Sequence, residues 1–467
     1  LKSLWLQLGL LPPMFQSADQ ASVMADAKTY VLKDLDADAF HADLLAAKAA
    51  VGEATEADAR HLQGIVRATH VLLYGGHALL FLGTAQAWGL SAAATCLLAA
   101  AMISTGRCMR WTIVGHHVMH GGYDKLQRSR PGCLEPQYKR GVFAMGARRV
   151  LDWMDWMLPE AWDAEHNSMH HLYLSENKDP DLVENNFSMM HSLPIPKVLK
   201  YLSMLGWMAS WKYAYYSPNT FKELQFACKG SWLTKRWPAS TSREKPLVLT
   251  HIVFENPARA LLRGAFGELA FWACFLLLWL GVVVPMAAMV ALPAATPLLL
   301  STVGAWPFAA APADAAWRAL AVAALAESLT NAHSFIIIAC NHAGEDLYRY
   351  ETSCKAYTAE WFCRCAHSSV NFECGNDLID SLYGWLNYQI EHHMFPDMSL
   401  LQYRKLQPLV KSICKKHGVL YVQQNALRRM WQMFRIAAGD AKMIRCTALI
   451  PPKVESAGVA DSPLLGG

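Results

Sequence analysis

The chain has 467 residues, enough for one large domain or two ordinary ones. It is 53% hydrophobic and only 17% charged, which excludes an ordinary soluble enzyme, whereas a mean hydropathy of +0.13 excludes a protein made only of membrane spans. The net charge of +4 is mild and does not indicate nucleic-acid binding. A membrane protein with a sizeable polar head lies between these limits.

The first 62 residues contain no apolar run long enough to cross a bilayer. Residues 1–15 are apolar but short, so we expect a segment at the membrane surface, and residues 17–62 are polar and rich in alanine, which indicates soluble helices or a loose extension. We therefore predict an N-terminal extension over 1–62, a membrane domain over 63–422 and a C-terminal tail over 423–467.

Four apolar stretches approach the roughly 20 residues that a helix needs to cross the hydrocarbon core. We predict membrane spans over 65–90, 91–113, 260–292 and 316–339. Residues 293–313 are apolar but interrupted by prolines, so a hairpin or lumenal loop at the membrane surface is expected there.

The distribution of basic residues predicts the topology. The stretch 106–259 holds 20 Lys and Arg residues, whereas none lies between the first two spans and none lies in 285–317. Positive charge collects on the inner side of membranes. The long middle stretch and both termini should therefore share one face, cytosolic or stromal.

Histidines gather in three short clusters, each just outside a predicted span and on the same predicted face. The segment GHHVMHGGY holds His116, His117 and His120; AEHNSMHHLYL holds His166, His170 and His171; LNYQIEHHMF holds Gln389, His392 and His393. Any single histidine is more often a core or surface residue, as we expect for His70, His77, His191, His251 and His417. Eight histidines in three tight clusters indicate a metal site instead.

The spacing inside the clusters has a geometric reason. Residues four apart share a face of an α-helix. His116 and His120 would form such a pair, as would His166 and His170, and Gln389 and His393. Neighbours in a doublet diverge by about 100°, so His170 and His171 would reach two metals about 3–4 Å apart. Imidazole suits iron, zinc and copper, and the scarcity of carboxylates argues against magnesium and calcium.

The three segments HHVMH, HNSMHH and QIEHH together resemble the three histidine boxes of the integral-membrane fatty acid desaturases. The resemblance covers about residues 106–421 and includes the order of spans and boxes; the glutamine of the third box is similar to the front-end and acyl-lipid group. The resemblance implies an all-α membrane protein with about four transmembrane helices and a helical cap, cytosolic or stromal, that holds a diiron site.

That family uses two non-haem iron ions, O₂ and two electrons to remove two hydrogens from a lipid acyl chain. Box by box, the resemblance implies the ligands His116, His120, His166, His170, His171, His392 and His393, with Gln389 as a ligand or water holder. The family also takes a histidine from the end of the fourth span. Of the two candidates, His342 lies at the polar end of the span and His333 deeper, so His342 is expected.

Two features depart from the family pattern. His117 stands where front-end members often have aspartate, and its role stays open; it is a ligand or only a neighbour of the ligands. The chain contains no His-Pro-Gly-Gly motif of a fused cytochrome b5 domain. Electrons would then come from a separate carrier, ferredoxin or cytochrome b5, whose acidic surface the basic face can steer. The membrane would be that of the ER or the plastid.

Ligand imidazoles need acceptors for their second N–H. The acids near the boxes are candidates for this role, or else ordinary solvated residues: Asp152, Asp155, Asp163, Glu165, Asp181 and Glu391.

Three alternatives remain. A hydroxylase or ketolase of the same superfamily, acting on an alkane, sterol or carotenoid, would use the same irons; Gln389 and four rather than six spans favour desaturation. A metal transporter would place its ligands near the middle of the membrane.

Four cysteines and a histidine are close in sequence, but their spacing matches no common zinc module, and reduced thiols are the simpler interpretation: Cys354, Cys363, Cys365, Cys374 and His367.

Overall fold

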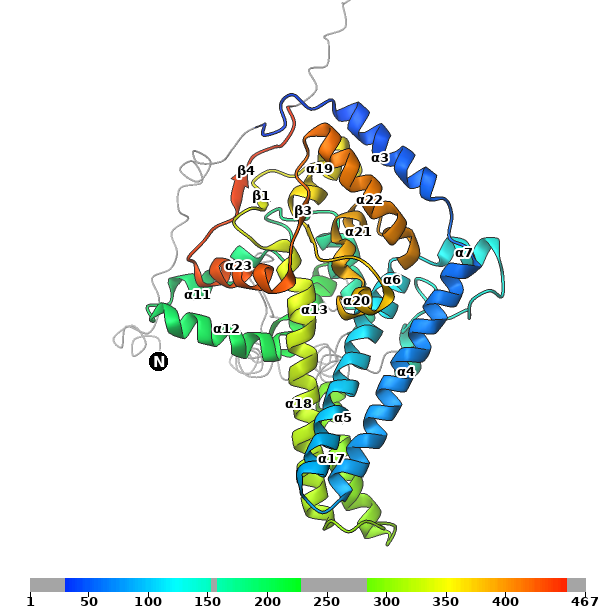
Figure 1. Cartoon of the computed structure of the whole chain (residues 1–467). Coiled ribbons are helices and arrows are strands. Elements are labelled where there is room, and N and C mark those ends of the chain that lie inside the picture. The colour runs from blue at the N-terminus through cyan, green and yellow to red at the C-terminus, as the bar shows by residue number, and fades with distance from the viewer. Residues whose placement is uncertain (1–29, 153–157, 228–283, 452–467) are drawn as a thin grey trace, which may run out of the picture.

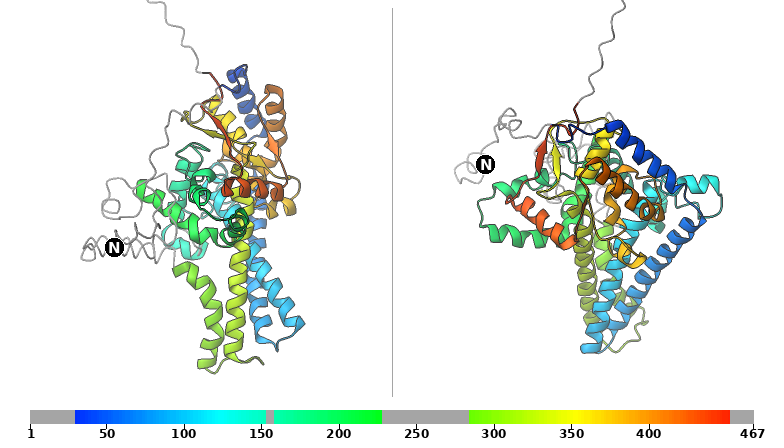
Figure 2. Two further views of the ribbon diagram at one scale, coloured as in Figure 1. Left: turned by 90° about the vertical axis from the view of Figure 1, so that its left-hand side faces the viewer. Right: turned by 45° about the horizontal axis from the view of Figure 1, so that its top comes forward.

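The computed structural model describes residues 30–152, 158–227 and 284–451. Four helices, α4, α5, α17 and α18, project side by side from a broad cap that contains the other described elements (Figure 1, Figure 2). Almost all of the described regular structure is helical. The predicted all-α fold with membrane-spanning helices is confirmed.

Three helical segments in the described part of the chain are long and apolar enough to cross a bilayer: Glu56–Ala85, Leu90–Met119 and Pro312–His342. The first is α4. The second joins α5 (Leu90–Met109), the π-helical η1 (Arg110–Gly115) and α6 (His116–Met119), and the third joins α18 (Pro312–Ile338) to η8 (Ala339–His342).

Helix α4 begins nine residues before the predicted span 65–90. Thr55 and Asp58 form a capping box, in which the Asp58 carboxylate accepts the Thr55 backbone N–H at 2.8 Å. Asp58 also accepts a hydrogen bond from Ser399 of the cap. The first turns of α4 are therefore polar because they contact the cap.

The expected hairpin over 293–313 is wrong in its first half, because α17 runs as one helix over Val284–Thr302 with Pro293 and Pro297 inside it. In hydrocarbon, backbone N–H and C=O groups without hydrogen bonds cost more free energy than a proline inside a helix does. The apolar segment therefore stays helical, although its prolines have no N–H to donate. The Thr296 hydroxyl adds a hydrogen bond to the Leu292 carbonyl at 2.8 Å. Residues 260–283 of the predicted third span lie outside the described part of the chain.

The cap is built mainly of short helices. Its first half, in chain order, contains α3 (Ala37–Val51), α7 (Asp124–Ser129), η2 (Gly146–Arg148), α8 (Arg149–Asp152), α9 (Pro159–Trp162), η3 (Asp163–His170), α10 (Val183–Asn186), α11 (Ser188–Ser192), α12 (Lys197–Trp211), η4 (Lys212–Tyr216) and α13 (Ser217–Ala227). Its second half contains α19 (Ala359–His367), α20 (Asp377–Leu382), η9 (Leu386–Tyr388), α21 (Gln389–Met394), α22 (Leu400–His417) and α23 (Ala426–Ala438).

Two small parallel sheets join the end of the described chain to the rest of the cap. Strand β1 (Tyr348–Tyr350) pairs with β4 (Ile444–Cys446), and β2 (Val370–Asn371) pairs with β3 (Val422–Gln423). Strand β2 of the second sheet contacts α21, the helix that holds the third histidine cluster.

A buried ionic network connects the cap to the membrane helices. Arg107 of α5 forms an ion pair with Glu327 of α18, and the Lys212 ammonium of η4 lies 3.3 Å from the same carboxylate. Asn331 of α18 accepts the Lys212 backbone N–H at 3.0 Å. Charges inside a membrane protein are costly unless paired. The network therefore fixes η4 against α5 and α18.

Candidate metal centre

Eight histidines meet where the membrane helices enter the cap, and they form two adjoining groups. The ligand atoms of each group lie within 4.8 Å of one another, and every member is buried. The larger group contains His116, His120, His166, His171 and His392, and the smaller one His170, His342 and His393. The structure thus brings together every histidine that the sequence nominated as a ligand.

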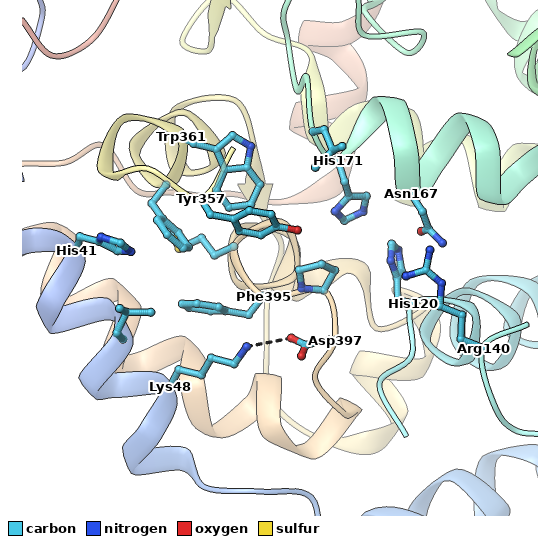
Figure 3. Close-up of a pocket in the computed structure, with 15 residues that line it drawn as sticks. His41, Lys48, His120, Arg140, Asn167, His171, Tyr357, Trp361, Phe395 and Asp397 are labelled. Atoms are coloured by element: carbon cyan, nitrogen blue, oxygen red, sulfur yellow. Dashed lines mark hydrogen bonds and ion pairs between the residues drawn. The ribbon is translucent and has the colours of Figure 1, made fainter. Parts of the chain in front are cut away.

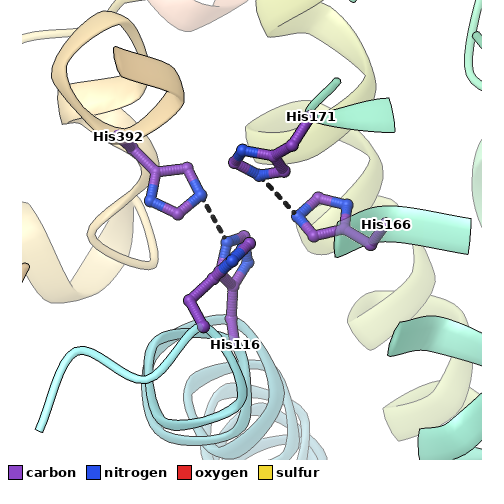
Figure 4. A group of neighbouring side chains, drawn as sticks. His116, His166, His171 and His392 are labelled. Carbon is purple, nitrogen blue, oxygen red and sulfur yellow. Dashed lines mark hydrogen bonds between the residues drawn. The ribbon is translucent and has the colours of Figure 1, made fainter. Parts of the chain in front are cut away.

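Each element contributes its histidines from a different side. His116 lies on α6 at the end of the second membrane segment, His166 on η3 and His392 on α21. Figure 4 shows four rings of the larger group facing one another, with His116 Nε2 2.8 Å from His392 Nε2 and His166 Nε2 3.2 Å from His171 Nε2. The stacked rings of His171 and His393, 4.3 Å apart, connect the two groups.

These nitrogen spacings fit a shared metal ion. Two nitrogens bound at right angles to one ion, each about 2.1 Å away, lie about 3 Å apart. His120 Nε2 is buried and has no hydrogen-bond partner among the described residues, which is unusual for a polar atom in a protein interior. The donor set is therefore suited to a transition metal such as iron.

Gln389 belongs to the smaller group. Its Nε2 lies 2.9 Å from His342 Nε2 and 3.1 Å from His393 Nε2, and the side chain is 3% exposed. Turning the amide by 180° would present Oε1, which has no hydrogen-bond partner in the described structure, to the same position. The side chain can therefore bind a metal ion or hydrogen-bond a water held there.

The second histidine cluster lies on a π-helix, so the α-helical geometry expected from its spacing is wrong. The backbone N–H of His171 donates to the carbonyl of His166, five residues earlier, at 3.0 Å. A π-turn has about 4.4 residues, so residues four and five apart both lie on the side of the first. His171 therefore joins His166 in the larger group, while His170 faces the smaller one.

Three residues that the sequence did not nominate orient the rings. His170 Nδ1 lies 2.9 Å from Asp179 Oδ1, His342 Nδ1 lies 3.0 Å from the Ser368 carbonyl, and His392 Nδ1 lies 3.2 Å from the Tyr403 hydroxyl. Such contacts fix the tautomer and leave Nε2 for a metal. Only Asp179, in the segment KDPDL that follows the second cluster, had a local signal in the sequence.

Burial keeps most of these rings uncharged. Burial in the protein interior lowers the pKa values of His120, His166, His171, His392 and His393 well below the usual value of 6.5. Burial also lowers the pKa of His170, but the nearby Asp179 and Asp181 outweigh it, so this pKa is raised. Neutral imidazole is the form that binds metal, and its burial costs less than that of imidazolium.

Of the nominated acids, Glu391 and Asp152 serve other groups. The Glu391 carboxylate accepts from Asn371 Nδ2 at 2.8 Å and from the Tyr421 hydroxyl at 2.9 Å. Burial raises the pKa of Glu391 to about 7. Asp152 forms an ion pair with Arg148 at 2.7 Å. Both residues stabilise the cap rather than a histidine ring.

Asp181 is the nominated acid that approaches a ring, with Oδ2 4.0 Å from His170 Nδ1. Glu165 is fully buried and accepts from the Tyr216 hydroxyl at 3.3 Å. Asp163 accepts from Asn167 at 2.5 Å, and Asp155 lies outside the described residues. The acids next to the second cluster therefore differ in role, and Asp179 makes the closest contact with a ring.

Two ambiguous histidines lie outside both groups. His117 is buried beside the larger group, with Nδ1 3.0 Å from the Ile113 carbonyl. His333 Nε2 lies 2.6 Å from the Leu382 carbonyl, whereas His342 lies in the smaller group. The structure thus places His342 and not His333 with the other rings.

The cysteines and the histidine considered for zinc form no metal-binding group within the described ranges. Burial raises the pKa values of Cys363 and Cys365 well above the usual range, which keeps both as thiols. His367 Nε2 accepts the Leu420 backbone N–H at 3.1 Å. These residues therefore pack the cap.

A cavity of about 430 Å³ leads from the surface of the cap to the larger histidine group. Figure 3 shows it between α3 and the residues around His120 and His171, with the Lys48–Asp397 ion pair of 2.9 Å at one side. Aromatic side chains form much of its wall: Tyr357, Trp361, Phe362 and Phe395. The centre is therefore accessible from the side opposite the membrane helices.

Comparison with known proteins finds similarity to fatty acid desaturases over parts of the chain. Residues 286–425 match the family model described as fatty acid desaturase. The fatty acid desaturase 2-like protein FADS2B of Mus musculus is 46% identical over 64 residues, which cover 14% of this chain and 13% of that protein. The Delta(8)-fatty-acid desaturase of Borago officinalis is 30% identical over 109 residues, 23% of this chain and 22% of that protein.

Fatty acid desaturase 3 of Bos taurus is 56% identical over 43 residues, 9% of this chain and 10% of that protein. The matched segments thus span between 10% and 22% of the lengths of these three relatives. No solved structure matches the chain. Over the matched segments, the chain is thus similar to fatty acid desaturases, and the third histidine cluster lies within the residues that match the family model.

Replacing His171 by alanine removes the ring that connects the two groups. If each histidine group holds one ion, we expect the metal content of the purified variant to fall from about two ions per chain to one or fewer, because the His171 ring lies between the two groups. Inductively coupled plasma mass spectrometry measures this. His117→Ala is the matched control and should keep both ions. Equal loss in both variants would contradict the assignment.

Replacing Asp179 by asparagine keeps the shape of the side chain that contacts His170 but removes its charge. We expect a 10- to 100-fold fall in metal affinity or turnover, the usual effect of removing a carboxylate behind a ligating imidazole. Metal titration and turnover measurements test this. Asp163→Asn, which alters a partner of Asn167 and Arg140, is the control. If both variants behave like the unmodified protein, Asp179 does not orient His170.

Proposed function

We propose that this protein is an O₂-dependent desaturase that introduces a double bond into a lipid acyl chain, with two non-haem iron ions held by the two histidine groups. The observation that carries the proposal is the pair of adjoining, buried groups of eight histidines at the polar end of the membrane helices. The similarity of residues 286–425 to fatty acid desaturases supports it.

The overall reaction balances with an external source of electrons. Two neighbouring CH₂ groups of the acyl chain each lose one hydrogen and become a double bond, while O₂ with two electrons and two protons gives two waters. The bound irons would supply the redox chemistry with O₂. The electrons would come from a separate carrier, ferredoxin or cytochrome b5.

The residues around the groups hold the rings in place and keep water away. The Trp162 ring stacks on His166 at 4.5 Å and is 1% exposed. Asp179, Ser368 and Tyr403 hold three rings from behind through Nδ1. Rings held in fixed positions confine the oxidation to a substrate placed against them.

The proposed ligands are His116, His120, His166, His171 and His392 in the larger group and His170, His342 and His393 in the smaller one. Gln389 would be the weak member of the smaller group, because an amide binds metal less strongly than imidazole does. A weak position beside three imidazoles is where oxygen, water or substrate would approach the centre.

The proposed orientation puts the cap on the cytosolic face of the ER or the stromal face of a plastid membrane. The 20 basic residues over 106–259 and the absence of Lys and Arg over 285–317 support it. An acidic electron carrier would approach the same basic face.

The rival reaction is hydroxylation or ketone formation at the same irons, with oxygen inserted into the chain. No described feature favours it over desaturation, and the product distinguishes the two. The position of the histidine groups at one end of the membrane helices argues against a transporter, whose ligands lie near the middle of the bilayer.

Substitutions of Gln389 test the proposed reaction in yeast that expresses the protein, with gas chromatography and mass spectrometry of the fatty acids. Gln389→Leu should keep the fold but reduce the new unsaturated product at least about tenfold, because leucine neither binds metal nor hydrogen-bonds a water. Gln389→His should keep metal and some product, since imidazole still coordinates.

Gln407→Leu, which removes a hydrogen bond to Tyr421, is the matched control and should retain product. Product at the unmodified level from Gln389→Leu would show that Gln389 is only structural. Hydroxylated fatty acid instead of unsaturated fatty acid in the unmodified protein would establish the rival reaction.

A further inference from the structure

Helix α12 (Lys197–Trp211) carries an apolar face that the other described residues leave exposed. Val198, Leu202 and Leu205 are 66%, 57% and 48% exposed, and their positions fall within about 60° of one another around the helix. Met204 and Trp211 are buried on the opposite side, where α12 packs against α18 and α23. The helix therefore presents a second apolar face outward.

The connection between α12 and α18 fixes the depth of this face. The Trp211 indole N–H donates to the Asn331 carbonyl of α18 at 2.8 Å. Asn331 follows the first residue of α18, Pro312, by 19 positions. At 1.5 Å per residue this is about 28 Å, close to the roughly 30 Å thickness of the hydrocarbon core. The end of α12 thus lies at the inner boundary of the hydrocarbon.

The orientation of α12 suits the same boundary. Figure 1 shows α12 lying across the direction of α18, so it would run along the membrane surface rather than through it. Tyr201 of α12 stacks at 5.1 Å on Trp431 of α23, which is 54% exposed. Aromatic side chains collect at this level of membrane proteins.

We propose that α12 lies in the headgroup region of the inner leaflet and buries the Val198–Leu202–Leu205 face in lipid. Its depth and its orientation favour lipid as the occupant, and the membrane segment of α5 likewise exposes leucines, such as Leu97 at 61% exposure. This surface is independent of the proposed reaction. The other two occupants to be tested are residues 228–283 of the chain and a second copy of the protein.

The proposal also sets the height of the metal centre. His342 follows Asn331 by 11 positions, about 16 Å along the helix. The histidine groups would then lie above the hydrocarbon, inside the cap. An acyl chain would have to rise out of the bilayer, alongside α12 or through the cap, to reach them.

Photo-crosslinking tests the occupant. Benzoylphenylalanine replaces Leu202 in the full-length protein, which is reconstituted in phosphatidylcholine vesicles whose acyl chains carry an alkyne, irradiated and probed for lipid adducts. Position 97, in the membrane segment of α5, is the positive control, and position 409, 38% exposed on α22 of the cap, is the negative control. We expect lipid adducts at 202 and 97 and none at 409.

Peptide mapping of the crosslinked protein gives the outcomes that would overturn the proposal. An intramolecular adduct from position 202 to residues 228–283, or a covalent dimer, each without a lipid adduct, would assign the face to that occupant. No adduct at 202 when position 97 is labelled would show that the face meets water. Turnover of the benzoylphenylalanine-202 protein, measured separately, reports on the proposed reaction without affecting this result.

Discussion

The burial of many imidazoles against one another is the constraint on which the rest of the structure depends. Every imidazole has two nitrogens that need partners, and a buried polar atom without one costs about 1–3 kcal/mol. Buried nitrogens of His120, His166, His171 and His393 have no hydrogen-bond partner among the described residues. In His120 this nitrogen is Nε2, and a bound metal ion would offset its cost. In His166, His171 and His393 it is Nδ1, whereas Nε2 makes the contacts with the neighbouring side chains of the centre.

The fold supplies the geometry through elements that are ordinary in themselves. A π-helix turns His170 and His171 toward different groups, and the end of a membrane helix brings in His342. Backbone and side-chain acceptors fix the rings from behind, as in the 3.0 Å contact between His342 and the Ser368 carbonyl. The cavity beside α3 reaches His120 and His171, and α12, which we propose to lie at the membrane surface, packs against α18.

Local sequence pattern was enough to predict the membrane helices near 65–90, 91–113 and 316–339 and the three histidine clusters. His342 was nominated only through the resemblance to the desaturase family. The sequence pattern predicted a hairpin where α17 continues through Pro293. The need to hydrogen-bond the backbone within hydrocarbon outweighs the effect of the proline there. The π-helix η3 was not predicted, because its residue types are those of an α-helix. Tyr403 was not predicted either, because its contact with His392 depends on how α22 packs against α21. Helix type and contacts between distant segments are tertiary properties.

The most direct test of the account is Mössbauer spectroscopy of the protein loaded with ⁵⁷Fe, together with an iron count per chain. Two groups with different donor sets, five imidazoles in one and three imidazoles with an amide in the other, predict about two irons in equal amounts with two distinct quadrupole doublets. A single iron per chain, or stoichiometric zinc in protein made with iron in excess, would contradict the assignment of two iron positions.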